Sequence, residues 1–239
     1  MPSVAILPSA TERFLHEIAE ELRALRDDGL FRELTVLEGV DGARVRIGGR
    51  ELVSWCSNDY LGLAAHPALA EAAARAASEW GVGARASRLL AGTSRWHMQL
   101  EAALAAWFDV EAAIVFSSGY LANLGTLGSL VSSRDTVVID RLAHASLVDA
   151  VRSTRATLRV FRHNDPGHAA ELLSRASAVG RRFLVTEGVF SMDGDAAPLA
   201  ALADVADRTD ALIYLDDAHG AFVAGATGRG SPEAAGVAQ

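Results

Sequence analysis

The sequence predicts an α/β protein built around a mostly parallel sheet with crossover helices. From Ala112 onward, five short apolar runs (AAIVF, TVVID, LRVF, RFLVT and ALIYL) alternate with segments that are helical or partly so. This alternation is typical of parallel strands joined by helices. The runs are almost continuously apolar, as expected of strands buried on both faces of a sheet. A cluster of polar residues follows each run directly, and we expect these clusters to meet at one edge of the sheet.

The first half of the chain predicts smaller elements that precede the sheet. Residues 11–28 place apolar side chains on one helical stripe, with Ser9 and Glu12 spaced as a capping box and Gly29 as the stop. Residues 43–55 alternate in polarity around a Gly-Gly pair, which predicts a hairpin. Pro67 near a first turn and Gly81 past the last turn mark a helix at 67–80. A second helix is expected at about 94–108.

The composition is that of an ordinary globular protein. Half of the 239 residues are apolar and 22% are charged, enough for a sizeable core. The formal net charge of −8 provides no basic surface for nucleic acid, and no stretch approaches the roughly twenty apolar residues of a membrane span. Cys56 is the only cysteine, and the first residues lack the features of a secretory signal. We therefore expect a cytoplasmic protein.

The polar clusters contain residue types that bind ligands and transfer protons. In an open α/β sheet, ligands bind at the carboxyl edge because strand ends and helix N-termini converge there. Taken alone, any one cluster is better explained by helix capping in an ordinary loop, whereas five together favour a single polar site. In chain order the clusters are Ser117, Ser118 and Gly119; Asp140 and His144; His163, Asn164 and Asp165; Glu187 and Ser191; and Asp216, Asp217 and His219.

Three of these features together suit a site for pyridoxal phosphate (PLP). Gly119 and Tyr120 open a helical segment after a strand-like run, so their backbone N–H groups can hold a phosphate. Asp216 ends a buried run, where a carboxylate needs a cationic partner such as a protonated ring nitrogen. His144 is a flat side chain able to stack on a ring. A PLP enzyme has to orient the cofactor and keep its ring nitrogen protonated.

Longer motifs resemble one family of PLP enzymes. SNDYLGL, FSSGYLANLG, RLAHASLVDAV, FRHND, VTEGVFSMDGDAAPL and DDAHG are similar, in this order, to motifs of the 8-amino-7-oxononanoate synthases. These are α-oxoamine synthases with an aspartate aminotransferase-like fold, fold type I. The resemblance covers nearly the whole chain but only the N-terminal part and most of the large domain of the family. It implies an N-terminal helix and hairpin segment at 1–57 and an incomplete PLP-binding domain at 58–239.

The resemblance implies roles for residues at matching positions. Those that match cofactor contacts are Gly119 and Tyr120 at the phosphate, Ser191 and His219 near the phenolic oxygen, His144 on the ring face and Asp216 at the ring nitrogen. Those that match substrate contacts are Arg32 at the acyl chain, His144 near the amino-acid carboxylate, and Asn58 with Glu187 as a supporting pair. Of these, His144, Asp216 and His219 are the expected catalytic residues, and no metal ligand is expected.

The implied reaction is the decarboxylative condensation of L-alanine with pimeloyl-ACP or pimeloyl-CoA. It yields 8-amino-7-oxononanoate, carbon dioxide and the free carrier, early in biotin biosynthesis. Family active sites lie between two subunits, so a complete chain is expected to form a homodimer. The 239 residues contain no lysine, because all 22 cationic side chains are arginine. The chain resembles a synthase that stops short of the Schiff-base lysine, and we expect it to be inactive or nearly so.

Other interpretations remain open at this point. The chain could be a lysine-free partner subunit of a catalytic homologue, or belong with the related glycine-using ligase. Alternatively, His144, Asp216, Asp217 and His219 could bind a divalent metal in a hydrolase, since ions of this kind accept such ligands. Two local departures from the family pattern stand out, because Arg85-Ala86 and Phe222 occupy positions where relatives often have glycine.

Overall fold

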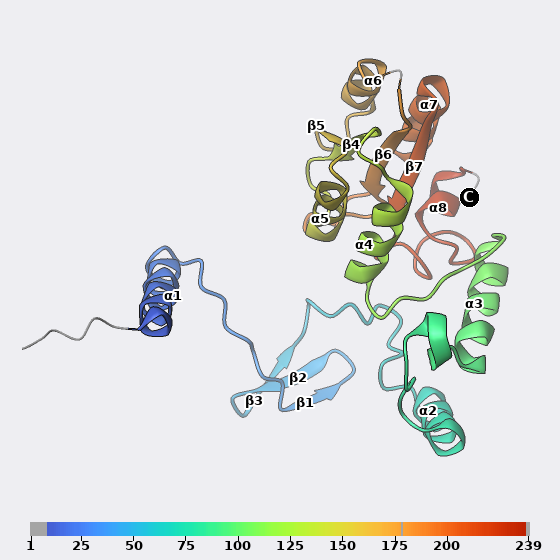
Figure 1. The fold of residues 1–239 in the computed structure, drawn as a ribbon. Helices are drawn as coiled ribbons and strands as arrows, with labels where there is room; N and C mark the ends of the chain where they lie inside the picture. Colours follow the sequence, from blue (N-terminus) through green and yellow to red (C-terminus); the bar gives the residue numbers. More distant parts are fainter. Residues whose placement is uncertain (1–8, 178, 238–239) are drawn as a thin grey trace, which may run out of the picture. The chain divides into compact units, whose positions relative to one another are not determined.

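The computed structural model describes residues 9–177 and 179–237 (Figure 1). The chain divides into two compact units, Met1–Ser57 and Asn58–Gln239. The second unit contains the parallel sheet and all but one of the candidate site residues, the exception being Arg32.

The first unit contains the predicted helix and hairpin. Helix α1 (Ala10–Asp27) begins with the predicted capping box, in which the Ser9 side chain accepts from the Glu12 backbone and the Glu12 side chain accepts from the Ser9 backbone. Strands β2 (Arg44–Ile47) and β3 (Arg50–Val53) form the predicted antiparallel hairpin. A third strand, β1 (Gly39–Asp41), pairs with β2. No sequence pattern predicts β1, because its three residues are all exposed and show no alternation.

The second unit opens with helices near its N-terminal end. Helix α2 (Pro67–Trp80) starts at the predicted proline and is followed by Gly81 as its C-cap, and α3 (Arg95–Phe108) starts after Ser94. Both predictions are confirmed. Between them lies a turn of π-helix, η1 (Arg88–Gly92), which no signal in the sequence predicted.

The sheet has four parallel strands in the order β5-β4-β6-β7. They are β4 (Thr136–Asp140), β5 (Thr157–Phe161), β6 (Arg182–Glu187) and β7 (Ala211–Asp216). Four of the five predicted strands are therefore confirmed, with the predicted parallel orientation. The remaining helices are α4 (Gly119–Leu130), α5 (Ala145–Thr154), α6 (Pro166–Ser174), α7 (Leu199–Thr209) and α8 (Ser231–Ala235).

Helices cover both faces of this sheet, and alternate strand residues belong to different cores (Figure 1). Val138 and Leu184 pack with α6 and α7, whereas Val137 and Val185 pack with α4 and α5. All four side chains are fully buried. Because each buried aliphatic side chain contributes about 1.5–3 kcal/mol, burial on both faces accounts for the near-continuous apolar runs of β4 and β6.

The prediction of a strand at 112–116 is wrong. This segment is assigned to no strand, and Ile114 is 74% exposed. Its backbone bonds to side chains instead of a neighbouring strand, because the Val115 N–H donates to Glu101 and the Val115 carbonyl accepts from Arg88. The partners Arg88 and Glu101 form an ion pair, and the bond from Arg88 lowers the pKa of Glu101 to about 2. The segment nevertheless leads into α4 as expected.

No helix within the described ranges combines the length and the apolar character that crossing a membrane requires.

Candidate functional site

Two carboxylates end adjacent strands at the carboxyl edge of the sheet. Glu187 is the last residue of β6 and Asp216 the last of β7, and the two are paired in the strand register. The Gly188 N–H also donates to the Asp216 carbonyl over 2.8 Å. Register pairing therefore holds the two side chains close together, as the polar clusters predicted.

Asn123 joins Asp216 to the N-terminal end of α5. The Asn123 side chain is buried on α4, and its Nδ2 donates to Asp216 Oδ2 over 2.7 Å and to Ser146 Oγ over 2.9 Å. Its Oδ1 accepts from the Tyr214 hydroxyl over 2.8 Å. Ser146 in turn lies 2.7 Å from His144 Nδ1. The predicted residues Asp216 and His144 thus belong to one hydrogen-bonded chain.

The direction of these bonds determines which nitrogen of His144 carries a proton. His144 is the N-cap residue of α5, and its Nδ1 accepts from the Ser146 backbone N–H over 3.2 Å. A nitrogen that accepts a hydrogen bond cannot carry a proton of its own, so neutral His144 has its proton on Nε2. The exposed ring therefore presents an N–H donor on its outer side.

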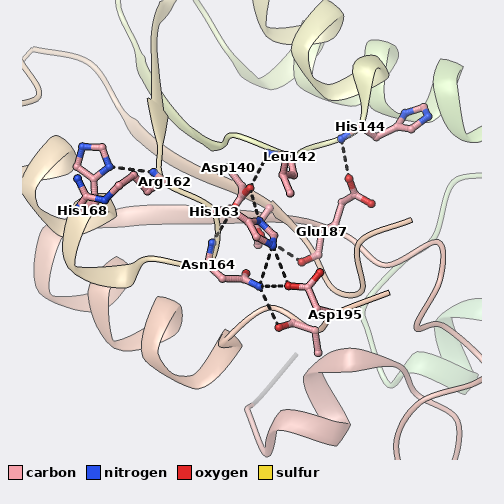
Figure 2. Close-up of polar contacts among 11 residues, drawn as sticks. Asp140, Leu142, His144, Arg162, His163, Asn164, His168, Glu187 and Asp195 are labelled. Atoms are coloured by element: carbon pink, nitrogen blue, oxygen red, sulfur yellow. Dashed lines mark hydrogen bonds and ion pairs between the residues drawn. The ribbon is translucent and has the colours of Figure 1, made fainter. Parts of the chain in front are cut away.

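Glu187 is buried, and its Oε1 accepts from the His144 backbone N–H over 2.7 Å (Figure 2). Burial raises the pKa of Glu187, and the nearby charge of Asp216 raises it further. Bonds from the His144 and Ser191 backbone N–H groups oppose this shift. Ser191 and His144 are thus both held through their backbone at Glu187.

Gly119 and Tyr120 form the first turn of α4, where N–H groups have no acceptor within the helix. A Cβ added at Gly119 would meet nothing within 4 Å, so the space beside this backbone is open. The Tyr120 hydroxyl donates to Asp149 over 2.8 Å, and this bond raises the pKa of Tyr120. The tyrosine side chain is therefore directed to α5, while its backbone N–H can serve an anion.

The remaining predicted residues have separate partners. His219 Nδ1 lies 2.6 Å from the Tyr60 hydroxyl, which also reaches Asn58 over 3.5 Å. Asn58 and Glu187, expected as a supporting pair, bond to Tyr60 and to His144 rather than to each other. Arg32 lies in the first unit, after α1, and is exposed.

Asp217 points to a different partner from Asp216. Its carboxylate accepts from the backbone N–H and the hydroxyl of Ser231, and burial raises its pKa. Gly188, Gly220 and Gly230 surround it so closely that an added Cβ would lie about 2 Å from its oxygens. Within the described ranges, no three His, Cys, Asp or Glu side chains are grouped to hold a metal ion. The geometry therefore offers no support for the metal-site interpretation.

Sequence reasoning missed the residues that connect the site. Asn123 follows Gly119 by four positions in GYLANLG, so it lies on the same side of the helix. That spacing could have drawn attention to Asn123. Tyr60 and Tyr214 gave no comparable signal, because a tyrosine in a loop or strand is common.

The donor set fits a cofactor with a protonated ring nitrogen and a phosphate. Glu187 and Asp216 lie side by side at the strand ends, and neither has an ion pair with any residue in the described part of the chain. A cation placed against Asp216 would compensate this charge. The open turn at Gly119 offers unpaired N–H groups for an anion at the other end of the ligand.

Comparison with known proteins supports this assignment. The family model for aminotransferase class I and II matches residues 50–238. The 8-amino-7-oxononanoate synthase of Geobacter metallireducens is 49% identical over 219 residues, which are 92% of this chain and 56% of the relative. That of Anaeromyxobacter sp. (strain K) is 50% identical over 220 residues, 92% of this chain and 55% of the relative. The chain spans about half the length of the curated relatives it matches.

Solved structures agree in fold. The serine palmitoyltransferase of Sphingomonas wittichii superimposes with a TM-score of 0.86 at 34% identity, over 96% of this chain and 58% of the other. A serine palmitoyltransferase from S. paucimobilis with bound PLP–myriocin aldimine gives 0.87 at 33% identity, over 97% and 58%. The 8-amino-7-oxononanoate synthase of Francisella tularensis gives 0.63 at 29%, over 76% and 49%. The predicted resemblance and fold class are confirmed, and the chain belongs to the family of class I and class II aminotransferases.

Proposed function

We propose that this chain forms the cofactor-binding part of an 8-amino-7-oxononanoate synthase. Its reaction would join L-alanine to the pimeloyl group of pimeloyl-ACP or pimeloyl-CoA, releasing carbon dioxide and the carrier thiol. The names of the curated relatives support this assignment. The structural observation that carries it is the hydrogen-bonded chain from Asp216 through Asn123 and Ser146 to His144. We place the reaction in the cytoplasm, in a homodimer.

Asp216 would receive the protonated ring nitrogen of PLP. When bound, PLP withdraws electrons from the Cα of the attached amino acid, most strongly with its nitrogen protonated. The Asn123 amide fixes one oxygen of Asp216, and the Ala218 N–H donates to the other over 3.1 Å. The two bonds fix the orientation of the carboxylate. Asp216 can therefore hold the ring proton in place.

His144 would cover the ring face and direct its Nε2–H to the amino-acid carboxylate. This donor orientation follows from the acceptor role of Nδ1. Gly119 and Tyr120 would bind the phosphate through backbone N–H groups, and Ser191 and His219 would bond near the phenolic oxygen. We assign Arg32 to the acyl substrate, and Asn58 with Glu187 to support the substrate site. None of the 239 residues is a lysine, so the role proposed for this stretch is binding and orientation.

The test uses a probe that needs no lysine, the reduced adduct N-(5′-phosphopyridoxyl)-L-alanine. We expect the chain to bind it in isothermal titration calorimetry. Asp216→Asn should weaken binding about 10- to 100-fold, the loss expected for a hydrogen bond between charged groups. Asp193→Asn is the matched control, because Asp193 is exposed on the loop after β6.

A second probe with CH in place of the ring nitrogen isolates the proposed contact. It should bind the native chain and Asp216→Asn with similar, weak affinity. The proposal fails if the native chain does not bind the phosphopyridoxyl probe, or if Asp216→Asn weakens both probes equally. Adducts of glycine and serine test the amino-acid preference, and the alanine adduct is expected to bind most tightly.

A further inference from the structure

His163 bridges two carboxylates beside the proposed cofactor site. It follows β5, and its side chain is 22% exposed. Its Nδ1 lies 2.9 Å from Asp140 Oδ1 and its Nε2 lies 2.8 Å from Asp195 Oδ2 (Figure 2). The Phe190 ring packs edge-on against the imidazole, with centroids 4.4 Å apart. None of the roles proposed above uses this histidine.

Both ring nitrogens of His163 must donate to make these two contacts. An ionised carboxylate only accepts, so a histidine bonded to one at each nitrogen is an imidazolium. The Asn164 amide group, 3.2 Å from Nε2, directs its own hydrogens to Asp195 Oδ2 and the Ala196 carbonyl. It therefore does not supply the proton between Nε2 and Asp195. The other nearby cation, Arg162, is paired with Asp165.

The charges facing His163 come from two different elements. Asp140 ends β4, and its side chain is fully buried. Asp195 lies in the loop after β6, with its side chain 43% exposed. Burial lowers the pKa of His163, but the bonds and charges of the two carboxylates outweigh it, so the pKa is raised overall. Asn164 and Phe190 complete the surroundings and carry no charge.

Each of the two aspartates belongs to a turn that carries a proposed site residue. Asp140 Oδ1 also accepts from the Leu142 N–H over 2.8 Å, which shapes the turn leading to His144. Asp140 Oδ2 accepts from the Asn164 N–H over 2.9 Å. On the other side, residues 190–195 form a closed turn through the Phe190 N–H to Asp195 carbonyl bond, and this turn contains Ser191.

We propose that His163 is a positioning residue whose imidazolium ties the turn at 140–144 to the loop at 190–195, and so sets the spacing of His144 and Ser191. The tie itself is a property of the folded chain. Its effect on ligand binding rests on the proposed function. When His163 loses a proton, one of its two carboxylate contacts loses its donor. The tie between the two loops then weakens, while the bonds of Asn164 to both carboxylates remain.

The first experiment tests the tie without a ligand. Nitrogen-15 NMR of the ring of His163 should show both nitrogens protonated at neutral pH. Folding raises the pKa of His163. The tie is therefore complete below about pH 6.5, the pKa of free histidine, and is lost as the pH rises through the pKa of His163 in the folded chain. Between these values, the protection factors of the Leu142 and Asn164 amides, corrected for intrinsic exchange, should fall about tenfold per pH unit.

Variants separate the tie from general structural damage. His163→Gln should remove the pH step in protection, whereas His168→Gln should keep it, because His168 Nδ1 only accepts from the Arg162 N–H. If His163→Gln does not fold, Asp195→Asn gives the same test by lowering the pKa of His163. A neutral His163 ring at pH 7 in the native chain, or protection independent of pH, overturns the tie.

The second experiment tests the effect on the site. His163→Gln should weaken binding of N-(5′-phosphopyridoxyl)-L-alanine about tenfold at pH 7, and the difference from the native chain should shrink at higher pH. Equal affinities at pH 7 would overturn the positioning role. If the native chain does not bind the probe, the proposed function fails, while the NMR and exchange results still decide the tie.

Discussion

Asn123 is the residue whose replacement tests the proposed site most directly. Its side chain is 6% exposed and makes bonds with Asp216, Ser146 and Tyr214. Asn123→Ala removes all of them and leaves a half-buried carboxylate without its amide donor. A hydrogen bond to a charged group contributes about 1.5–3 kcal/mol and a neutral one about 1 kcal/mol. Since bonds within one network are not additive, we expect the free energy of unfolding to fall by about 3 kcal/mol.

The assay is urea unfolding followed by circular dichroism, with Asn58→Ala as the control. Asn58 is exposed, and its side chain accepts a long bond from the Tyr60 hydroxyl, over 3.5 Å. Its replacement should therefore change stability by less than about 0.5 kcal/mol. Asn123→Asp adds a sharper comparison, because it puts a second carboxylate against Asp216 and should be more harmful at neutral than at acid pH. If Asn123→Ala costs no more than Asn58→Ala, the network does not stabilise the site and our reasoning is wrong.

Three further predictions follow from single positions. Burial raises the pKa of Glu187, so the stability that this residue contributes is present below the pKa of the unfolded chain and is lost as the pH rises through the pKa of the folded chain. Glu187→Gln keeps the acceptor for the His144 N–H. Its urea midpoint should therefore be higher than that of the native chain at pH 7 and equal to it below about pH 4. Gly119→Ala should weaken binding of the phosphopyridoxyl probe in calorimetry, because its methyl group enters the open space beside the first turn of α4. Gly128→Ala, where an added Cβ also meets nothing within 4 Å, should leave binding unchanged and stabilise the helix by about 0.5–1 kcal/mol. Equal affinities of the two variants would argue against a phosphate at this turn. Arg85 has φ +66°, a left-handed conformation that costs a non-glycine residue about 1–2 kcal/mol. Arg85→Gly should therefore be about 1 kcal/mol more stable than Arg85→Ala in thermal unfolding. The reverse order of stability would show that the turn is unstrained.

The two local departures from the family pattern have a backbone explanation. Arg85 and Phe222, at positions where the family resemblance leads us to expect glycine, both have positive φ, +66° and +64°. In the structure, the Phe222 ring packs against Trp107 and Phe108 of α3, with centroids 5.8 and 5.2 Å apart. These aromatic contacts offset part of the conformational cost at Phe222. Arg85 donates an exposed hydrogen bond to the Trp80 carbonyl and lies over the Trp80 ring, 5.9 Å from its centroid.

The amino-acid sequence alone determined most of the local structure. Capping residues located α1, α2 and α3, and apolar runs located β4, β5, β6 and β7. These signals are readable because helix ends and buried strands depend on residues close together in the chain. The same locality explains the failure at 112–116, where an apolar run takes its hydrogen bonds from Arg88 and Glu101. An apolar run becomes a strand only where another strand lies beside it, and the residues of the run do not determine whether such a strand is there.

The tertiary structure alone decided which polar residues meet. Asn123 lies 93 positions from Asp216 in the chain, and His163 lies 32 positions from Asp195. The polar clusters in the sequence predicted that such side chains lie at one edge of the sheet, but they did not predict which side chains bond to each other. The bond partners follow from the register of β6 with β7 and from the position of α4, whose Asn123 bonds to Asp216 and Tyr214 of β7. The order of residues along the chain does not specify distances as short as a hydrogen bond. Many packings are compatible with the same pattern of apolar and polar residues, and the tertiary structure selects the one in which Asn123 lies between Asp216 and Ser146.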